Sequence, residues 1–308
     1  MRRLVLIASL GLLASTALAD DAWYPSKYGK DDTIGAANNL SAAGVVEAAK
    51  LVKTGKTYSL GVTVGPDTPA YGTRNFQIFT EASIFGTPLG TNKATGNDDF
   101  LATWMGIGSQ LDGLGHLGID FVYYNGHKES EFLRPHGLLK LSTDKVPPIV
   151  TRGVLLDMVA LKGGNLAGGT AVNRADIEAA VAKQGTPIRK GDVVILHTGW
   201  LASMADKDKK KFLETEPGLG KGGAEYLVSL GVVAVGADQW AVEAIPPEDS
   251  KEAFPVHQIL IARNGVYILE NMNVGALAAD KGYEFLFVLG QPKFAGAVQA
   301  IINPIAIR

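Results

Sequence analysis

The chain contains no cysteine among its 308 residues. Neither a disulfide nor a thiolate can therefore contribute, and a metal site would have to use imidazole, carboxylate and amide groups. Charged residues make up 19% of the chain and the formal net charge is -2, so nucleic acid is not expected as a partner. With 46% hydrophobic residues the composition is globular, and the length allows one large domain or two small ones.

Long apolar runs are also missing, and the N-terminal run is short. Arg2 and Arg3 precede an apolar stretch over residues 4–13, and the Ala-Leu-Ala segment at 17–19 has the form of a cleavage site. The pattern predicts a signal peptide over residues 1–19, with a buried N-terminal helix as the alternative. The run is too short to span a bilayer. We therefore expect an exported protein, periplasmic or secreted, that is free of the membrane after signal cleavage.

The rest of the chain mixes many strand patterns with a few helix patterns. Strands are predicted over residues 57–64, 100–107, 154–158, 193–197, 232–235, 266–269, 284–289 and 297–302. Helices are predicted over residues 41–52, 175–182, 222–230 and 252–263. No internal repeat or linker interrupts the sequence. The pattern favours a single mixed α/β domain over residues 20–308.

One glycine-rich stretch, residues 106–116, gathers groups that could carry chemistry. Gln110 and Asp112 are two positions apart, so in extended chain they face the same side. His116 can join them only if the glycine turn folds back. Carboxylate and amide oxygens together with imidazole suit zinc or manganese. The alternative is a plain polar turn in which Asp112 caps a neighbouring backbone segment.

A second pair of candidate residues lies far along the chain. His257 falls within a predicted helix, and Glu270 ends the strand that follows the Asn264-Gly265 turn. A helix-turn-strand hairpin brings its two ends close, so both side chains could reach one ion. Taken alone, a histidine on an amphipathic helix is more often a satisfied surface or core group.

The chain resembles the cyclase family, which includes hydrolases of the kynurenine formamidase and isatin hydrolase kinds. The resemblance is carried by residues 34–40 (IGAANNL), 106–116, 192–200 (DVVILHTGW) and 257–271. The family signature is H-x-G-T-H-x-D-A-P-x-H. Here Asp112 and His116 are kept, whereas Gly106 and Gln110 stand in place of the first two histidines and Gly-Leu replaces Ala-Pro.

The resemblance implies a single mixed-sheet α/β domain of the swivelling β/β/α type. It implies a metal-dependent hydrolase that cleaves a carbon–nitrogen amide bond in a small amide or lactam, with arylformamidase as the type. One divalent ion, zinc or manganese, would be held by Gln110, Asp112, His257 and Glu270, with His116 as the acid–base group. Gly106 has no side chain to hold a second ion. Relatives form dimers or tetramers, so we expect a homodimer or homotetramer.

Three further residues are candidates for the substrate pocket. His197 ends a predicted strand, and Asp238 and Trp240 follow the strand at 232–235. The alternative for the last two is a structural turn. Two other functions stay open: a catalytically inactive family member that binds a small molecule in the periplasm, and a purely structural secreted subunit.

Overall fold

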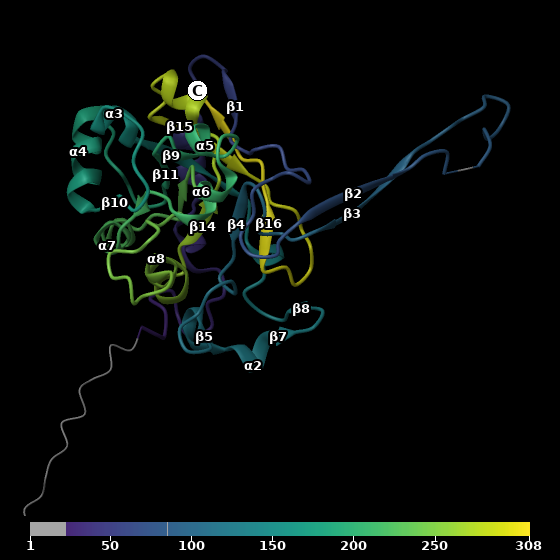
Figure 1. The fold of residues 1–308 in the computed structure, drawn as a ribbon. Coiled ribbons are helices and arrows are strands. Elements are labelled where there is room, and N and C mark those ends of the chain that lie inside the picture. Colours follow the sequence, from purple (N-terminus) through teal and green to yellow (C-terminus); the bar gives the residue numbers. More distant parts are fainter. Residues whose placement is uncertain (1–22, 85) are drawn as a thin grey trace, which may run out of the picture.

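The computed structural model describes residues 23–84 and 86–308, so the predicted signal peptide at 1–19 lies outside the described residues. A nine-stranded mixed sheet forms the centre of the molecule, in the order β1-β17-β15-β9-β11-β13-β14-β4-β16 (Figure 1). Its strands are β1 (Thr57–Ser59), β4 (Gln110–Asp112), β9 (Ile149–Asp157), β11 (Val193–His197), β13 (Ala234–Ala237), β14 (Tyr267–Glu270), β15 (Glu284–Leu289), β16 (Gln299–Ile301) and β17 (Ile305–Ile307). The predicted α/β class with one mixed sheet is confirmed.

The helices are short and surround this sheet. They are α1 (Ala42–Ala49), α2 (Glu129–Phe132), α3 (Met158–Lys162), α4 (Arg174–Gln184), α5 (Trp200–Met204), α6 (Lys209–Glu214), α7 (Lys221–Ser229), α8 (Pro255–His257), which continues as a π-helical segment over Gln258–Arg263, and α9 (Gly275–Ala279). Figure 1 shows α3, α4 and α7 gathered on one side of the sheet. Within residues 23–84 and 86–308, no helix has both the length and the apolar character to cross a membrane.

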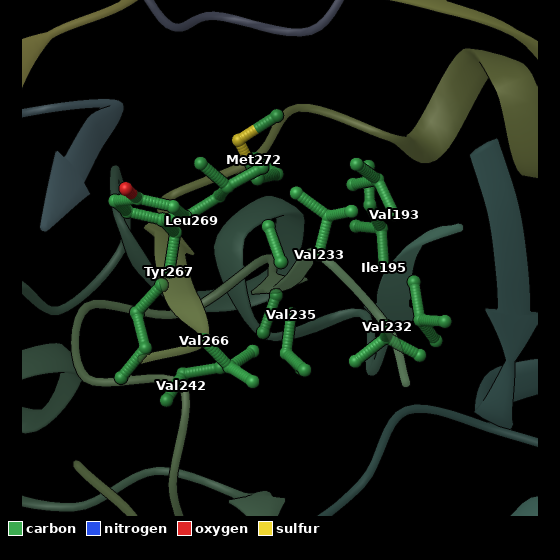
Figure 2. Packing of buried hydrophobic residues seen from close by; sticks show 14 of the residues in the cluster. Val193, Ile195, Val232, Val233, Val235, Val242, Val266, Tyr267, Leu269 and Met272 are labelled. Atoms are coloured by element: carbon green, nitrogen blue, oxygen red, sulfur yellow. The ribbon is translucent and has the colours of Figure 1, made fainter. Parts of the chain in front are cut away.

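Four neighbouring strands, β9, β11, β13 and β14, run parallel to one another. Valine, isoleucine and leucine dominate them because both faces of these strands are covered. Figure 2 shows their packing, with Val193 and Ile195 of β11 beside Val233, Val235 and Leu269. Since the strands are parallel, their carboxyl ends meet at one edge of the sheet, where α/β proteins bind ligands.

The segment before the glycine-rich stretch differs from the prediction. The predicted strand at 100–107 is β3 (Asp98–Thr103), which pairs with β2 (Phe76–Glu81) in a hairpin that extends far from the body (Figure 1). After β1 the chain returns to the central sheet only at β4, within the stretch expected to be a turn. Glycine explains the break: Gly108 has φ +63, and a Cβ there would lie 2.4 Å from Val64 Cγ2.

Other boundaries moved by a few residues. The strand predicted at 57–64 ends at Ser59, and the strand predicted at 297–302 is the shorter β16. The helix predicted at 252–263 begins at Pro255, because Phe254 lies in the left-handed region with φ 50. The remaining pairs are small: β5 (Val122–Tyr123) with β6 (His127–Lys128), β7 (Leu133–Arg134) with β8 (Gly137–Leu138), and β10 (Ala171–Val172) with β12 (Gly218–Leu219).

Candidate metal centre

Strand β4 presents Gln110 and Asp112 on one side, as the two-residue spacing predicts, and both side chains are buried. The antiparallel partner β14 places Glu270 directly opposite Gln110. The amide nitrogen of Gln110 donates to Glu270 Oε2 at 2.6 Å and to Asp112 Oδ1 at 3.2 Å. On the other side of β4, Gln299 of β16 donates to the same Asp112 Oδ1 at 2.7 Å. Two amides therefore hold one oxygen of Asp112.

The other oxygen of Asp112 faces two imidazoles. Asp112 Oδ2 lies 3.6 Å from His257 Nε2 and 3.8 Å from His116 Nε2. His116 reaches it because the chain after β4 folds back, with the His116 amide bonded to the Gly113 carbonyl at 3.0 Å. Within the described residues, Asp112 Oδ2 is buried and has no hydrogen-bond partner. Such an atom is expected to have a ligand, an ion or a water that satisfies it.

His257 is oriented by a carboxylate from a third part of the chain. Its Nδ1 lies 2.6 Å from Glu243 Oε1, and its Nε2 lies 3.3 Å from Glu270 Oε1. Glu243 also accepts the backbone amides of Val256 and His257, so it fixes the start of α8. A carboxylate on the far nitrogen of a histidine is the usual support for a metal ligand.

The residues present fit a metal ion. Ligand atoms of Asp112, His116 and His257 lie within 4.8 Å of one another. Two ligands of one tetrahedral zinc ion are roughly 3.3–3.6 Å apart by their bond lengths, close to the 3.6 and 3.8 Å observed. The structure thus adds His116, predicted as an acid–base group, to the possible ligands. The side chain of Gln110 directs its amide nitrogen at the carboxylates of Asp112 and Glu270. Carboxylates accept hydrogen bonds, so they require the donor end of the amide.

Charge in the cluster is out of balance. Burial raises the pKa of Glu270 to about 8, with the Asp112 charge adding to the effect. Burial also acts on Asp112, but the charges of His116 and His257 and the hydrogen bond from Gln299 hold its pKa at about 2. Burial and the neighbouring Glu270 raise the pKa of Glu216 well above its ordinary value. A buried surplus of carboxylates is the setting in which a cation is favourable.

A cavity of about 190 Å³ opens onto the cluster. Its walls include Tyr71, Trp240 and Phe254, and the first two rings stack at 5.1 Å with 13° between their planes. The predicted pocket residue Trp240 therefore lies beside the candidate metal ligands. Such aromatic walls suit a flat organic molecule. Sequence reasoning missed Tyr71, Phe254 and Glu243, although Glu243 lies in the segment that Asp238 begins.

His197 and Asp238 lie elsewhere. Both line a different cavity of about 550 Å³, so the three predicted pocket residues do not share one cavity. Asp238 is buried and accepts hydrogen bonds from Thr198 and from the Gly199 amide, all between 2.6 and 2.8 Å. These bonds agree with the alternative that Asp238 supports a turn.

The position of Gly106 is filled by other side chains. A Cβ there would lie 2.6 Å from Gln299 Oε1 and 2.7 Å from Arg74 Nη1. The Arg74 guanidinium donates to the Gly106 carbonyl at 2.7 Å and lines the cavity of the cluster. Arg74 therefore puts a permanent positive charge at the position where the family signature has its first histidine.

Comparison with known proteins agrees with this geometry. The family model described as "Putative cyclase" matches residues 58–244, and the chain belongs to the cyclase family. A crystal structure of a novel cyclase is 32% identical, covers 92% of this chain and 96% of its own, and has a TM-score of 0.84.

More distant structures share the fold. An isatin hydrolase bound to the product analogue thioisatinate is 19% identical with a TM-score of 0.59, covering 87% of this chain and 98% of its own. A potential metal-dependent hydrolase with cyclase activity is 16% identical with a TM-score of 0.52, covering 82% and 98%. No match is found among the curated proteins.

Proposed function

We propose that the protein is a metal-dependent hydrolase that cleaves the carbon–nitrogen bond of a small aromatic amide or lactam. The observation that carries this proposal is the buried Asp112 Oδ2, which lacks a protein partner in the part of the chain the structure describes and faces His116 and His257. Support comes from membership of the cyclase family and from neighbours that include an isatin hydrolase.

The metal would be one zinc or manganese ion, held by Asp112 and His257 with Glu270 beside them. When bound, such an ion lowers the pKa of a coordinated water and polarises a carbonyl group. Glu243 keeps the Nε2 of His257 directed at Asp112. Gln110 holds Asp112 and Glu270 together through its two donated bonds. The role of Gln110 as a ligand through its oxygen stays a prediction.

His116 would act as the acid–base group. Unlike His257, it makes no side-chain hydrogen bond to any residue within 23–84 and 86–308, and it lines the cavity with one fifth of its side chain exposed. A ring that no carboxylate orients and that faces substrate can take a proton from water and deliver it to the leaving nitrogen. The distance of 3.8 Å between His116 Nε2 and Asp112 Oδ2 also permits His116 to bind the ion. The His116→Asn variant distinguishes the two roles.

Arg74 would bind the carbonyl side of the substrate. The guanidinium is fixed by the Gly106 carbonyl and lies in the same cavity as His116. A permanent positive charge there would stabilise the oxyanion that forms as the amide is attacked. Replacement by Met should lower kcat/KM by roughly 10²-fold and leave the metal content unchanged, whereas Arg74→Lys should keep part of the activity.

The direct test is the metal content of the purified mature protein, followed by hydrolysis of a panel of formanilides and lactams with and without that ion. We expect one divalent ion per chain and ion-dependent hydrolysis of at least one aromatic amide. An ion-free protein that binds an aromatic amide without cleaving it would favour the alternative, an inactive binding module.

Assembly and export are part of the same proposal. The β2–β3 hairpin exposes Ile78, Phe79, Phe100 and Leu101 by 47–64%. A two-stranded hairpin with bare aromatic residues gains stability when another surface covers it. We propose that a second copy of the chain does so, in a homodimer or homotetramer of an exported protein. Light scattering of the wild type and of a Phe79→Ser, Phe100→Ser variant tests the assembly, which the double substitution should weaken.

A further inference from the structure

The larger cavity has the features of a second ligand site. Its volume of about 550 Å³ falls within the range of small-molecule sites, about 300–1,000 Å³. Three parts of the chain enclose it: the loop at 62–69, the helical region at 201–212 and the segment at 271–275 that follows β14. It lies at the carboxyl ends of the parallel strands, and among the described residues it shares no lining residue with the cavity of the metal centre.

His197 supplies a free polar atom to this cavity. Its Nδ1 lies 3.0 Å from Asp157 Oδ1, which also accepts the Ala160 amide at 3.0 Å and is thereby fixed at the start of α3. His197 Nε2 makes no hydrogen bond to any residue of the described ranges, and the side chain retains 13% exposure. The imidazole is therefore anchored at one nitrogen and open at the other.

Two carboxylates favour the protonated form of this imidazole. Burial acts against it, but the hydrogen bond to Asp157 and the charges of Asp238 and Asp157 raise the pKa of His197. The oxygens of Asp238 are already occupied by Thr198 and Gly199, so they are not free to bind a ligand. An imidazolium with a free N–H donor selects an anionic acceptor.

The walls around His197 are largely apolar. The apolar lining residues are Leu201, Phe212, Met272, Val274 and, on the loop at 62–69, Pro66. The charged lining groups other than His197 and Asp238 are Asp67, Asp206 and Lys209, all exposed, and the Lys209 ammonium bonds to the Asp67 carbonyl. Water screens the charges of exposed rim residues, but it screens the charge of the largely buried His197 imidazole much less.

We propose that this cavity binds a small apolar organic acid, with its carboxylate on His197 Nε2 and its hydrocarbon body against Leu201, Phe212 and Met272. The site is separate from the metal centre and does not depend on the hydrolase activity proposed above.

Calorimetry with three probes of equal shape tests the ligand class: 3-phenylpropionate, 3-phenylpropionamide and 3-phenylpropylamine. The acid should bind, the amide should bind at least ten-fold more weakly, and the amine should not bind, because only the acid pairs with an imidazolium. Binding of the amine as tight as that of the acid, or no binding of the acid, would overturn the proposal.

Two substitutions of His197 locate the carboxylate. In His197→Asn the amide can replace Nδ1 and keep the bond to Asp157, so the fold is kept and acid binding should fall at least ten-fold. In His197→Gln the amide can replace Nε2, so weaker binding should remain without preference for the acid. His136→Asn, at an exposed histidine, should bind like the wild type. Unchanged affinity in both His197 variants would contradict the assignment.

Two more variants separate this cavity from the metal centre. Ala205→Phe should fill the cavity and abolish binding, whereas Ala182→Phe, at an exposed position of α4, should not. Asp112→Asn removes a metal ligand and should leave the affinity for the acid unchanged. Loss of binding in Asp112→Asn with retention in Ala205→Phe would place the acid at the metal centre and refute a second site.

Affinity for the acid should also decrease as pH rises through the raised pKa of His197. The charged groups around this ring are Asp157, Asp238 and the rim residues Asp67, Asp206 and Lys209. Burial raises the pKa of Asp238, whereas the bond to His197 lowers the pKa of Asp157 against the effect of burial. A constant affinity from pH 6 to 9, as the His197→Gln variant should show, would mean that the imidazolium is not the anchor.

Discussion

The two cavities at the carboxyl edge of the sheet differ in the charge of their buried polar groups. The cavity at the candidate metal centre is small, has aromatic walls and opens onto a cluster of buried carboxylates that imidazoles balance only in part. The larger cavity has apolar walls and the imidazole of His197, whose Nδ1 is held by Asp157 and whose Nε2 is free. Buried carboxylates without enough partners favour a cation in the first cavity. The free N–H donor of His197 favours an anionic acceptor in the second. Neighbouring strand ends on one sheet can thus serve opposite chemistry.

The substitution Asp112→Asn should have the largest effect at the metal centre. The ion loses its charged ligand, so metal content should fall to near zero, and activity should fall by about 10³-fold or more, as expected when the ion supplies the nucleophile. Elemental analysis and hydrolysis assays measure both. His197→Asn, in the other cavity, should retain the ion. Full metal content in Asp112→Asn would contradict the ligand assignment.

His116→Asn distinguishes an acid–base group from a ligand. If His116 moves the proton, activity should fall by about 10²–10⁴-fold while the ion stays bound, and the pH–rate profile should lose one limb. Elemental analysis of the same preparation provides the second measurement. Loss of the ion together with activity would make His116 the third metal ligand and remove its proposed acid–base role.

Glu243→Gln tests the support of His257. The amide can still accept one hydrogen bond but no longer holds His257 Nδ1 with a negative charge, so metal affinity should fall by about 10–100-fold. Competition with a chromophoric chelator measures the change. Glu248→Gln, on a carboxylate that bonds to Asn173 and does not line the cavity of the cluster, is the matched control. Equal affinity in both variants would show that Glu243 serves only to begin α8.

The smallest effect is expected from the His197–Asp157 pair on stability. The pKa of His197 is raised in the folded chain, so its stabilising contribution is fully present below its ordinary value of 6.5 and is lost as pH rises through the raised value. The pKa of Asp157 is lowered although burial opposes this, so the same pair also weakens at strongly acidic pH. The difference in Tm between wild type and His197→Asn should therefore shrink above neutral pH. A constant difference from pH 5 to 9 would refute the ion pair.

Much of the candidate metal centre can be predicted from local spacing. The side chains of Gln110 and Asp112 share a face because alternate residues of a strand always do. His257 and Glu270 meet because a short turn joins a helix to a strand that runs back along it. The strands at 193–197 and 232–235 are predicted from runs made mostly of β-branched residues and leucine, as in parallel buried strands, and β13 begins two residues later than predicted.

The hairpin at 76–103 illustrates what local patterns cannot supply. Phe100 and Leu101 look like core residues of a central strand, yet they are 64% and 47% exposed on an arm that leaves the body. An apolar strand pattern shows that a segment pairs with another, but not where the pair lies. The same limit applies to His197, which ends a strand as predicted but faces a different cavity from Trp240.

Local pattern is enough to predict the fold class, the family resemblance and the pairs of residues that lie close along the chain, because hydrophobic periodicity and short turns act over a few residues. Which distant groups share a site depends on how the whole chain packs. Arg74 and Gln299 meet at Gly106, Glu243 reaches His257, and His116 turns back to Asp112. These meetings depend on strand order and on loops of many residues, whose path is set by packing of the whole sheet rather than by any local pattern.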